Sequence, residues 1–546
     1  MTEEINDRLT RERLGELVQA HEINTVMLGV PDLMGRLKGK SFDALHFLTQ
    51  LPGGSEMCAY ILASDVNMTP LDGFGLTGWH EGYGDLKVVP DLGAIRRLSY
   101  LPGTVLIFGD AHDHNGYPIP VAPREMLRQQ INYLADLGWE VRVGIESEFL
   151  LYRGSADRSR RAGYRGLTPV SPHNLDYALD HPPGLSAFFG ALRAALHQAD
   201  APVAAIKTEG APGQIEVTWP YGDAMRACDT YAVHKHAVRA IAALHPMTPT
   251  FMAAPETGIG SGLHFHVSLW RDGEPKFETA FGAGLPEVLG QSIAGLLDAL
   301  PEVAPLYAPY PNSYRRFAPH SFAPTNFTWG YDNRTCAIRV AGRHKDTRLE
   351  ARLPGADANP YLALAAVLAG ILHGITKHPK LPDPCTGDAY EANPLPKPVP
   401  RTLDEAVAAF MEGSLATHAF SPSVVQHYAH AARRPLRRHA GSRHARLPTP
   451  GRHRRTGDRS ASGRRGGSRR CAWRRFLRRC YRARASGTRP DGRRSRDSSS
   501  AQGRSSPVAV PPTFPRETPR ASLPTAVQRS RDRPPSRTGR RWTVRR

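Results

Sequence analysis

The 546-residue chain carries a formal net charge of +20, but this charge is unevenly distributed. Residues 1–433 hold 37 basic and 46 acidic side chains, whereas residues 434–546 hold 34 arginines, no lysine and five acidic side chains. Most of the chain is therefore acidic, and its overall charge does not identify a nucleic-acid-binding protein. The six cysteines lack the spacing of a zinc site or a disulfide framework, which favours a reducing compartment.

The N-terminal residues 1–110 are predicted to form a small α+β unit. The chain begins with an acidic, polar segment that does not resemble a signal peptide. Apolar side chains at helical spacing predict a helix over residues 9–22, and the run 25–30 predicts a strand that is followed by a turn and a second strand. Short strands and glycine-rich turns continue to about residue 106 and include the loop 72–85.

Residues 118–433 are predicted to form a larger second domain. After the proline-rich stretch 118–123, strands alternate with long apolar helices such as 224–244. This alternation favours one large antiparallel or mixed sheet with helices packed outside it. The longest apolar run, 361–372, is too short to span a bilayer, and Pro360 before it is typical of the first turn of a buried helix. We therefore expect a cytoplasmic protein that does not enter a membrane.

Four predicted strands carry acidic or imidazole side chains on one face and apolar side chains on the other, because alternate residues of a strand share a face. These strands span residues 141–152, 205–219, 261–270 and 347–353. The side chains that they would place on one surface are Glu146, Glu148, Glu209, Glu216, His264 and Glu350. Each motif alone more often has a structural explanation. Two glutamates on a strand are usually a solvated face, two histidines are commonly hydrogen-bonded by neighbouring groups, and alternating arginine and glutamate usually form surface ion pairs. Only the combination of these motifs indicates a functional site.

Five carboxylates cannot share a small volume in ionised form unless cations neutralise them. Oxygen-rich ligation with a single imidazole suits Mg²⁺ or Mn²⁺ better than zinc. The strand 347–353 adds Arg348 and Arg352 to the same face as Glu350, and planar guanidinium groups fit carboxylate and phosphate oxygens. The pattern therefore predicts a two-metal site lined with arginines, which is the kind of site that phosphoryl transfer requires.

The segment 434–546 contains no Ile, Asn or Lys and shows no hydrophobic periodicity, so we expect it to be disordered. One interpretation is an arm that binds nucleic acid, in a non-specific way. The other is out-of-frame translation of a GC-rich gene, because the three missing residue types use A-rich or AU-rich codons. The abrupt change directly after the well-patterned helix 423–433 favours the second interpretation.

With these motifs in place, the chain resembles the glutamine synthetase family over residues 10–433, in the branch that includes γ-glutamyl-polyamine and γ-glutamyl-ethanolamide synthetases. The segments that carry the resemblance, in the order of the family, are ESE at 146–148, EGAPGQIE at 209–216, GSGLHFH at 260–266, NSYRR at 312–316, RLEAR at 348–352 and ANPYLALAA at 358–366. The resemblance implies an α+β fold with a small N-terminal β-grasp-like domain and a catalytic domain built on a curved antiparallel sheet covered by helices. It also implies a homo-oligomer of stacked hexameric rings, with each active site shared between neighbours.

The resemblance further implies ATP as co-substrate and two or more Mg²⁺ or Mn²⁺ ions in each site. One ion would be held by Glu148, Glu209 and Glu216, and the other by Glu146, His264 and Glu350. The residues implied to bind ATP are His266, Ser268, Arg339 and Arg348; those implied to bind glutamate are Arg316, Arg352 and Gly262; those implied to act in catalysis are Asp72, Arg334 and Arg339. Glutamate would be activated as γ-glutamyl phosphate, which an amine then attacks.

The chain departs from the family pattern at three places, of which the first two lie near the position of the attacking nitrogen. Phe322 stands where ammonia-using members carry a flap glutamate, the family's Asp-Gly-Ser-Ser loop reads DGFG at 72–75, and Ala254 replaces a family lysine. These changes favour an amine larger than ammonia, such as a polyamine or ethanolamine, with polyamines slightly favoured by the acidic body. The alternatives are an ordinary glutamine synthetase that uses ammonium, a catalytically silent family member, and a nucleic-acid-binding protein driven by the segment 434–546.

Overall fold

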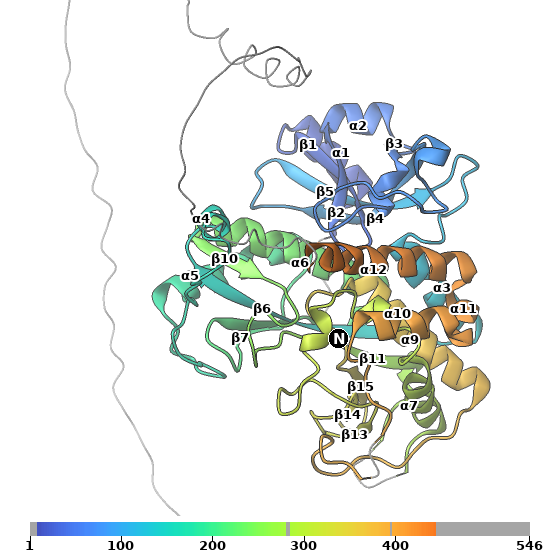
Figure 1. Cartoon of the computed structure of the whole chain (residues 1–546). Coiled ribbons are helices and arrows are strands. Elements are labelled where there is room, and N and C mark those ends of the chain that lie inside the picture. Colours follow the sequence, from blue (N-terminus) through green and yellow to red (C-terminus); the bar gives the residue numbers. More distant parts are fainter. Residues whose placement is uncertain (1–7, 280–283, 394–395, 444–546) are drawn as a thin grey trace, which may run out of the picture. The chain divides into compact units, whose positions relative to one another are not determined.

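A five-stranded sheet follows the N-terminal helix in the computed structural model, which describes residues 8–279, 284–393 and 396–443 (Figure 1). Its elements are α1 Arg11–Gln19, β1 Thr25–Pro31, β2 Leu37–Asp43, α2 Ala44–Gln50, β3 Ser55–Cys58, β4 Asp85–Arg97 and β5 Thr104–His112, with short 3₁₀ turns at Ala59–Leu62 and Trp79–Glu81. The strand order is β2-β1-β5-β4-β3, in which β1 and β5 are parallel and the other pairs are antiparallel. The predicted α+β unit is therefore present, and its β-grasp-like classification stays a prediction.

A ten-stranded sheet forms the centre of the larger part of the chain. Its strands are β6 Glu140–Arg153, β7 Ala205–Thr208, β8 Gln214–Thr218, β9 Gly222–Asp223, β10 Met247–Thr250, β11 Leu263–Arg271, β12 Glu274–Pro275, β13 Trp329–Tyr331, β14 Ile338–Ala341 and β15 Arg348–Ala351. The main order is β13-β14-β15-β11-β6-β8-β7, with β9 and β10 paired to β6 and β12 paired to β11. All pairs are antiparallel except β13 and β14, so the sheet is mixed at this edge rather than antiparallel throughout.

Helices of the second part include several that coincide with the predicted segments. They are α3 Pro123–Asp136, α4 Ala156–Arg161, α5 Pro183–Gln198, α6 Ala224–Leu244, α7 Glu287–Ala299, α8 Ala304–Tyr307, α9 Pro360–Lys377, α10 Leu403–Glu412, α11 Ser414–Phe420 and α12 Pro422–Arg443, with a 3₁₀ turn at Ser313–Arg315. The side chain of Asp223 accepts a hydrogen bond from the amide of Arg226 and so caps α6. Asn359 caps α9 in the same way, and Pro360 occupies its first turn.

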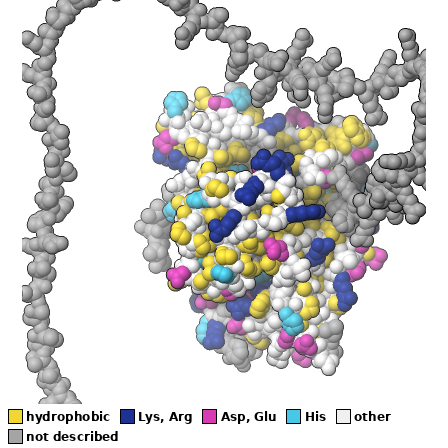
Figure 2. All heavy atoms as spheres, turned by 60° about the vertical axis from the view of Figure 1, so that its left-hand side comes forward, with side chains coloured by type: hydrophobic (Ala, Val, Ile, Leu, Met, Phe, Trp, Pro, Cys, Tyr) yellow, Lys and Arg dark blue, Asp and Glu magenta, His cyan; other side chains and the backbone are white. Residues whose placement is uncertain are grey.

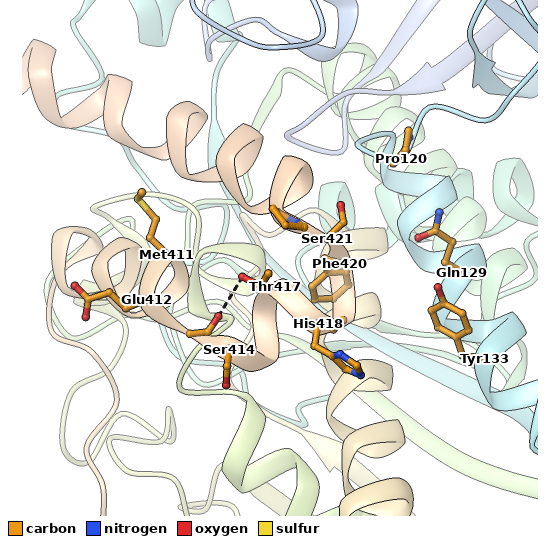
Figure 3. A pocket seen from close by; sticks show the side chains of 13 residues that line it. Pro120, Gln129, Tyr133, Met411, Glu412, Ser414, Thr417, His418, Phe420 and Ser421 are labelled. Carbon is orange, nitrogen blue, oxygen red and sulfur yellow. Dashed lines mark hydrogen bonds between the residues drawn. The ribbon is translucent and has the colours of Figure 1, made fainter.

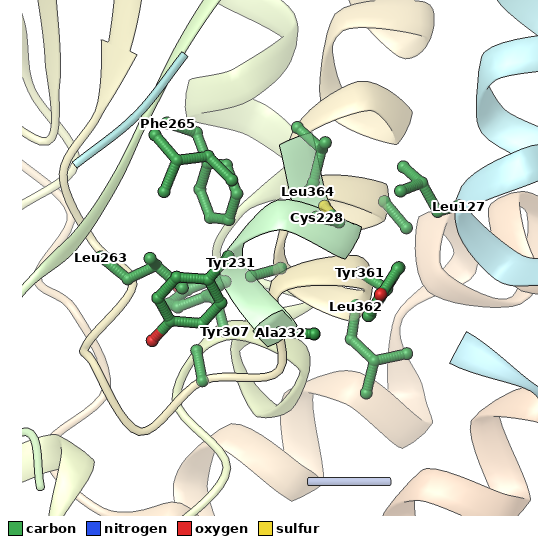
Figure 4. Packing of buried hydrophobic residues seen from close by; sticks show 14 of the residues in the cluster. Leu127, Cys228, Tyr231, Ala232, Leu263, Phe265, Tyr307, Tyr361, Leu362 and Leu364 are labelled. Carbon is green, nitrogen blue, oxygen red and sulfur yellow. The ribbon is translucent and has the colours of Figure 1, made fainter. Parts of the chain in front are cut away.

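Helix α9 has the length and apolar composition of a membrane span, but most of its side chains are buried inside the protein. Figure 4 shows Tyr361 and Leu364 of this helix near Cys228 and Tyr231 of α6, with Phe265 of β11 on the other side of the cluster. Burying each large apolar side chain of this kind contributes about 1.5–3 kcal/mol. Helix α9 is therefore a buried helix of the hydrophobic core, as Pro360 and the apolar run predict.

The two sheets belong to one compact unit, joined by buried polar contacts. Arg124 of α3 is 1% exposed and pairs with Asp91 at 2.5 Å, with Asp110 at 2.9 Å and with Asp229 at 2.5 Å. These three carboxylates come from β4, β5 and α6, so a single guanidinium connects the first sheet to two helices of the second part. Burial acts against the Arg124 charge, but attraction to Asp229 and Asp110 outweighs it and raises the pKa of the guanidinium.

Charged side chains of both signs cover the surface that Figure 2 shows. Lys and Arg side chains gather over part of this face, with acidic and apolar side chains around them. This mixture agrees with the composition of residues 1–433, in which acidic groups outnumber basic groups. The charge that would favour nucleic acid therefore belongs to the sequence after residue 433.

The C-terminal helix α12 extends further than expected. It continues to Arg443, so the first ten residues of the segment predicted to be disordered are helical. Residues 444–546 lie outside the described residues, and the predictions of disorder and of out-of-frame translation remain predictions for them. The earlier part of α12 contacts the first sheet region, because His427 Nε2 lies 2.9 Å from the Leu62 carbonyl oxygen and the Tyr428 hydroxyl donates to the Val121 carbonyl oxygen at 2.8 Å.

A chain that ends at Arg443 is expected to keep the melting temperature and the activity of the full-length chain, because these α12 contacts remain. A chain that ends at Ser421 loses them and is expected to melt at a lower temperature. Thermal denaturation of the two truncated proteins and the full-length protein makes the comparison. A large loss of stability on removing residues 444–546 alone would contradict this prediction. The separate prediction of out-of-frame translation would be contradicted by the absence of family-like sequence in both other reading frames beyond codon 434.

Candidate active site

The ten-stranded sheet brings the predicted metal ligands together through cross-strand pairs. His264 of β11 lies directly opposite Glu146 of β6, and Glu148, two residues further along β6, lies opposite Glu216 of β8. On its other edge, β11 pairs with β15, which carries Glu350. Side chains alternate along each strand, so these five residues lie on one face of the sheet while their apolar neighbours face the core.

The first group of candidate ligands consists of Glu148, Glu209 and Glu216, each of which offers one oxygen within 4.8 Å of the others. The surrounding backbone holds two of these carboxylates in place. The amide of Gly262 donates to Glu148 Oε2 at 2.7 Å, and the amide of Gly210 donates to Glu209 Oε2 at 2.8 Å. Three carboxylates with fixed orientation and no competing soft ligand fit Mg²⁺ or Mn²⁺.

Lys207 also belongs to this group, although the sequence reasoning missed it. Its ammonium group contacts Glu209 and lies 3.8 Å from Glu216, while the Tyr177 ring lies 4.3 Å away. The alternation of β7 contained the signal, because Lys207 and Glu209 are two residues apart and therefore share a face. This cation neutralises part of the group's negative charge.

The remaining charge changes the behaviour of Glu216. Burial and the negative charge of Glu146 raise its pKa to about 9, even though Lys207 acts in the opposite direction. A carboxyl group that keeps its proton at neutral pH cannot serve as a strong metal ligand. A divalent cation would reverse this balance by stabilising the ionised form, so the group has the electrostatic character of a cation site.

The second group of candidate ligands consists of Glu146, His264 and Glu350, again with one ligand atom from each within 4.8 Å of the others. His264 Nδ1 lies 3.3 Å from Glu146 Oε2 and 3.6 Å from Glu350 Oε1. Arg316 donates to the other ring nitrogen, Nε2, at 3.3 Å. This donation places the ring proton of neutral His264 on Nδ1, so binding a metal ion through Nδ1 would require the proton to move to Nε2 and the contact with Arg316 to change.

Glu350 is completely buried and is surrounded by guanidinium groups. Arg339 donates to its Oε2 at 2.7 Å, and Arg352 contacts its Oε1. Burial alone would raise the pKa of Glu350, but attraction to Arg352 and His264 outweighs it and lowers the pKa to about 2. Glu350 is therefore both a candidate metal ligand and the counter-ion of Arg339, which is predicted to act in catalysis, and of Arg352, which is predicted to bind glutamate.

A cavity of about 640 Å³ opens beside Glu146. Three residues predicted to bind ATP, His266, Ser268 and Arg348, line it, whereas the fourth, Arg339, contacts Glu350 instead. Arg348 Nε donates to His266 Nδ1 at 3.1 Å, which leaves the second ring nitrogen facing Glu146 Oε1 at 2.8 Å. The cavity thus joins a basic wall to the second group of candidate ligands.

The residues predicted to bind glutamate lie together, but their polar atoms already have partners. Arg316 is 5% exposed and donates to the carbonyl oxygens of Arg352 and Leu353, and burial lowers the pKa of its guanidinium to about 10. Arg352 contacts Glu350. A Cβ atom at Gly262 would lie 2.5 Å from His264 Nε2, so the close approach of these groups requires glycine at this position.

A second cavity of about 810 Å³ lies elsewhere, between α3 and the segment that runs from α10 to α12. Figure 3 shows Gln129 and Tyr133 on one side of it and Met411, His418 and Phe420 on the other. None of the residues predicted to bind metal, ATP or glutamate lines this cavity. Volume alone therefore does not identify the site, and the arrangement of charge does.

Comparison with known proteins agrees with this geometry. Residues 120–445 match the glutamine synthetase catalytic domain. The γ-glutamylethanolamide synthetase GlnA4 of Streptomyces coelicolor is 42% identical over 423 residues, which cover 77% of this chain and 91% of the relative. The chain belongs to the glutamine synthetase family.

Two further relatives and one solved structure place the chain within that family. A glutamate–isopropylamine ligase of a Pseudomonas species is 34% identical and covers 79% of this chain and 94% of the relative. The γ-glutamylputrescine synthetase PuuA of Escherichia coli is 35% identical, with 70% and 81% covered. A structure of a GmaS/ADP complex superposes with a TM-score of 0.67 at 25% identity, covering 78% of this chain and 96% of the other. The mixed α/β fold is thus that of the glutamine synthetase family.

Two predicted site residues are not among the groups on this sheet face: Arg334 is exposed and lines another cavity, and Asp72 lies in the N-terminal part of the chain. The Asp72 side chain accepts a hydrogen bond from the Trp79 amide at 3.1 Å, and its carbonyl oxygen lies 3.0 Å from His430 Nε2 of α12. Phe74, in the same loop, is 2% exposed and packs on His427 with ring centroids 4.5 Å apart. The loop is therefore anchored on α12.

The metal-free enzyme is expected to respond to pH through Glu216. Its folded-state pKa of about 9 exceeds the ordinary value of 4.5, so between these two pH values the folded protein holds a proton that the unfolded chain has released. This group's contribution to stability therefore falls as pH rises. In a chelating buffer, the melting temperature of the wild type should fall relative to that of Glu216→Gln over this range. Parallel melting curves for the two proteins would contradict the prediction.

Proposed function

We propose that this chain is an ATP-dependent ligase that joins the γ-carboxylate of glutamate to a primary amine larger than ammonia, through γ-glutamyl phosphate. The observation that carries the proposal is the pair of ligand groups on one sheet face, which together demand cations beside a basic cavity. The names of the relatives, which refer to ethanolamide, isopropylamine and putrescine, support the same class of reaction.

The proposed reaction has two steps. A γ-carboxylate oxygen of glutamate attacks the terminal phosphorus of ATP, and ADP leaves. The amine nitrogen then attacks the carbonyl carbon of the γ-glutamyl phosphate and loses a proton, and phosphate leaves with the oxygen that came from glutamate. Activation is necessary because an amine does not displace a carboxylate oxygen unaided at neutral pH.

Separate groups of residues would bind the two metal ions and ATP. Glu148, Glu209 and Glu216 would hold one divalent ion and Glu146, His264 and Glu350 the other. When bound, these ions neutralise phosphate charge and stabilise the transition state of phosphoryl transfer. His266, Ser268 and Arg348 line the side on which ATP would bind.

Arginines supply the remaining positive charge of the proposed site. Arg334 and Arg339 would stabilise the transferred phosphoryl group, and Arg316, Arg352 and Gly262 would position glutamate. Arg334 is exposed, and Arg339 is oriented by Glu350 and Asp332. Guanidinium groups held in this way are already oriented before substrate binds, which lowers the cost of reorganisation during the reaction.

Phe322 supports an amine larger than ammonia. Its side chain is 65% exposed, which is unusual for a phenylalanine, and its φ of 57° lies in the left-handed region. A phenyl ring at this position offers no carboxylate to an ammonium ion and provides an apolar wall for an organic amine. Residues in such strained conformations are concentrated at binding sites and active sites.

The proposed assembly is the ring oligomer of the family, in which Asp72 would serve the active site of a neighbouring subunit. The exposed loop that carries Asp72 and its anchoring on α12 support this proposal. Light scattering of the active enzyme tests it directly. An active monomer would contradict the proposal.

The function is tested by incubating the chain with ATP, glutamate, Mg²⁺ and one amine at a time, and measuring both ADP and the γ-glutamyl amide. The panel contains ammonium, isopropylamine, ethanolamine and 1,4-diaminobutane. Amide formation with an organic amine at a higher kcat/KM than with ammonium supports the proposal. A preference for ammonium would instead make the chain an ordinary glutamine synthetase, and no turnover with any amine would make it a silent family member.

A further inference from the structure

A third cavity, of about 590 Å³, lies next to the predicted catalytic arginines. It is lined by Phe322, by the turn Tyr331, Asp332, Asn333 and Arg334, and by the segment from Pro384 to Gly387. Arg352 connects it to the metal-binding face, because its Nη2 donates to the Phe322 carbonyl oxygen at 3.3 Å and its Nε donates to the Arg334 carbonyl oxygen at 3.2 Å. The same side chain contacts Glu350, so the cavity and the second ligand group share one arginine.

Two aromatic rings and a proline give the cavity apolar walls. The Phe322 ring belongs to a residue whose backbone is held by Arg352, and Tyr331 and Pro384 also line the space. A carbon chain that enters from the side of the arginines would therefore contact apolar surface. This surface suits the tail of an organic amine and offers no apolar contact that an ammonium ion could use.

The charges around the cavity limit what that tail can carry. Among the described residues that line it, Asp332 has the one carboxylate, and Arg339 donates to this carboxylate through Nε at 3.0 Å and through Nη2. The Arg334 guanidinium is exposed and makes no hydrogen bond or ion pair to another described residue. A second ammonium group on the substrate would thus meet a single carboxylate, Asp332, which already attracts the guanidinium groups of Arg339 and Arg334.

We propose that this cavity receives the tail of the amine substrate and selects an uncharged tail, either alkyl or hydroxyalkyl, over a tail that ends in a second ammonium group. The inference rests on the proposed amine-ligase function and makes it more specific, with Phe322 and Asp332 as specificity-determining residues. Overall acidity of the body favours polyamines, but the local arrangement of Asp332, Arg334 and Arg339 points to a monoamine. Selection acts over a few ångströms, where the local charges outweigh the screened charge of distant residues.

The test compares amines of equal length that differ only at the tail. The full-length chain is assayed with butylamine, 4-amino-1-butanol and 1,4-diaminobutane, at a pH at which the second amine of the diamine is protonated, and amide formation is followed for each. We expect kcat/KM for the two uncharged-tail amines to exceed that for the diamine by at least about tenfold, mainly through KM. Equal or better use of the diamine, with amide still formed, overturns this inference and leaves the ligase function standing.

A variant that adds a negative charge to the cavity wall is compared with a control variant that keeps the wall apolar. Phe322→Glu adds a carboxylate to the cavity wall and is expected to move the preference toward the diamine, whereas Phe322→Leu keeps an apolar wall and is expected to keep the preference for uncharged tails. An unchanged preference in Phe322→Glu contradicts the assignment of this cavity to the amine tail. If no amine and no ammonium gives amide in the wild type, the proposed function itself fails, which is a different result from either outcome above.

Discussion

Glu216→Gln is expected to reduce metal-dependent kcat/KM by at least about 10²-fold, because a fixed electrostatic element of the phosphoryl-transfer site is lost. Burial and the charge of Glu146 keep Glu216 protonated without metal, with a pKa of about 9. A glutamine amide has nearly the same shape and charge as this protonated acid. The variant should therefore fold as well as the wild type without metal, and the damage should appear only where an ionised ligand is needed.

The measurement combines activity with metal-induced stabilisation. Mg²⁺ should raise the melting temperature of the wild type and have a much smaller effect on Glu216→Gln, because a ligand that binds only the folded state stabilises it. Glu140→Gln is the control, since Glu140 is an exposed residue of the neighbouring strand β6 and pairs with Arg142. Wild-type activity and a wild-type response to Mg²⁺ in Glu216→Gln would remove Glu216 from the proposed ligand group.

Glu350→Ala is expected to abolish turnover and also to lower the free energy of unfolding by about 3–5 kcal/mol, which is typical of removing one partner from a buried ion pair. The sequence alone predicts that this change would affect turnover far more than folding. The structure changes that expectation, because Glu350 is 0% exposed and contacts both Arg339 and Arg352. Its removal leaves two arginines without their shared counter-ion.

Denaturant unfolding of the metal-free protein separates the two effects. Glu274→Ala is the control, because Glu274 pairs with Lys345 at the surface and its loss should leave the free energy of unfolding nearly unchanged. A Glu350→Ala protein as stable as this control would show that the two arginines find other partners. It would also contradict the view of Glu350 as their common anchor.

Local patterns in the sequence were sufficient to predict the strands of the site. Alternation of charged and apolar residues predicts which side chains of β6, β11 and β15 share a face, and the structure places Glu146, His264 and Glu350 together as this pattern requires. Pro360 marks the start of the apolar helix, and the structure begins α9 at this residue. These features depend on neighbours in sequence, which a single chain displays directly.

Features that depend on distant pairing could not be predicted in the same way. Strand register determines that Lys207 lies opposite Glu216 and that Arg339 lies opposite Glu350. The cavity beside Phe322 requires segments more than fifty residues apart to meet. The division of six ligands into two groups came from the resemblance to the family, and the geometry now provides a physical basis for it.

The central claim is that the γ-carboxylate of glutamate is activated by phosphorylation before an amine attacks it. Glutamate labelled with ¹⁸O in its γ-carboxylate tests this claim when it is incubated with the chain, ATP, Mg²⁺ and an organic amine, and the released phosphate is analysed by mass spectrometry. The proposed mechanism predicts that one labelled oxygen appears in each phosphate formed with a γ-glutamyl amide. Amide formation with unlabelled phosphate would contradict it.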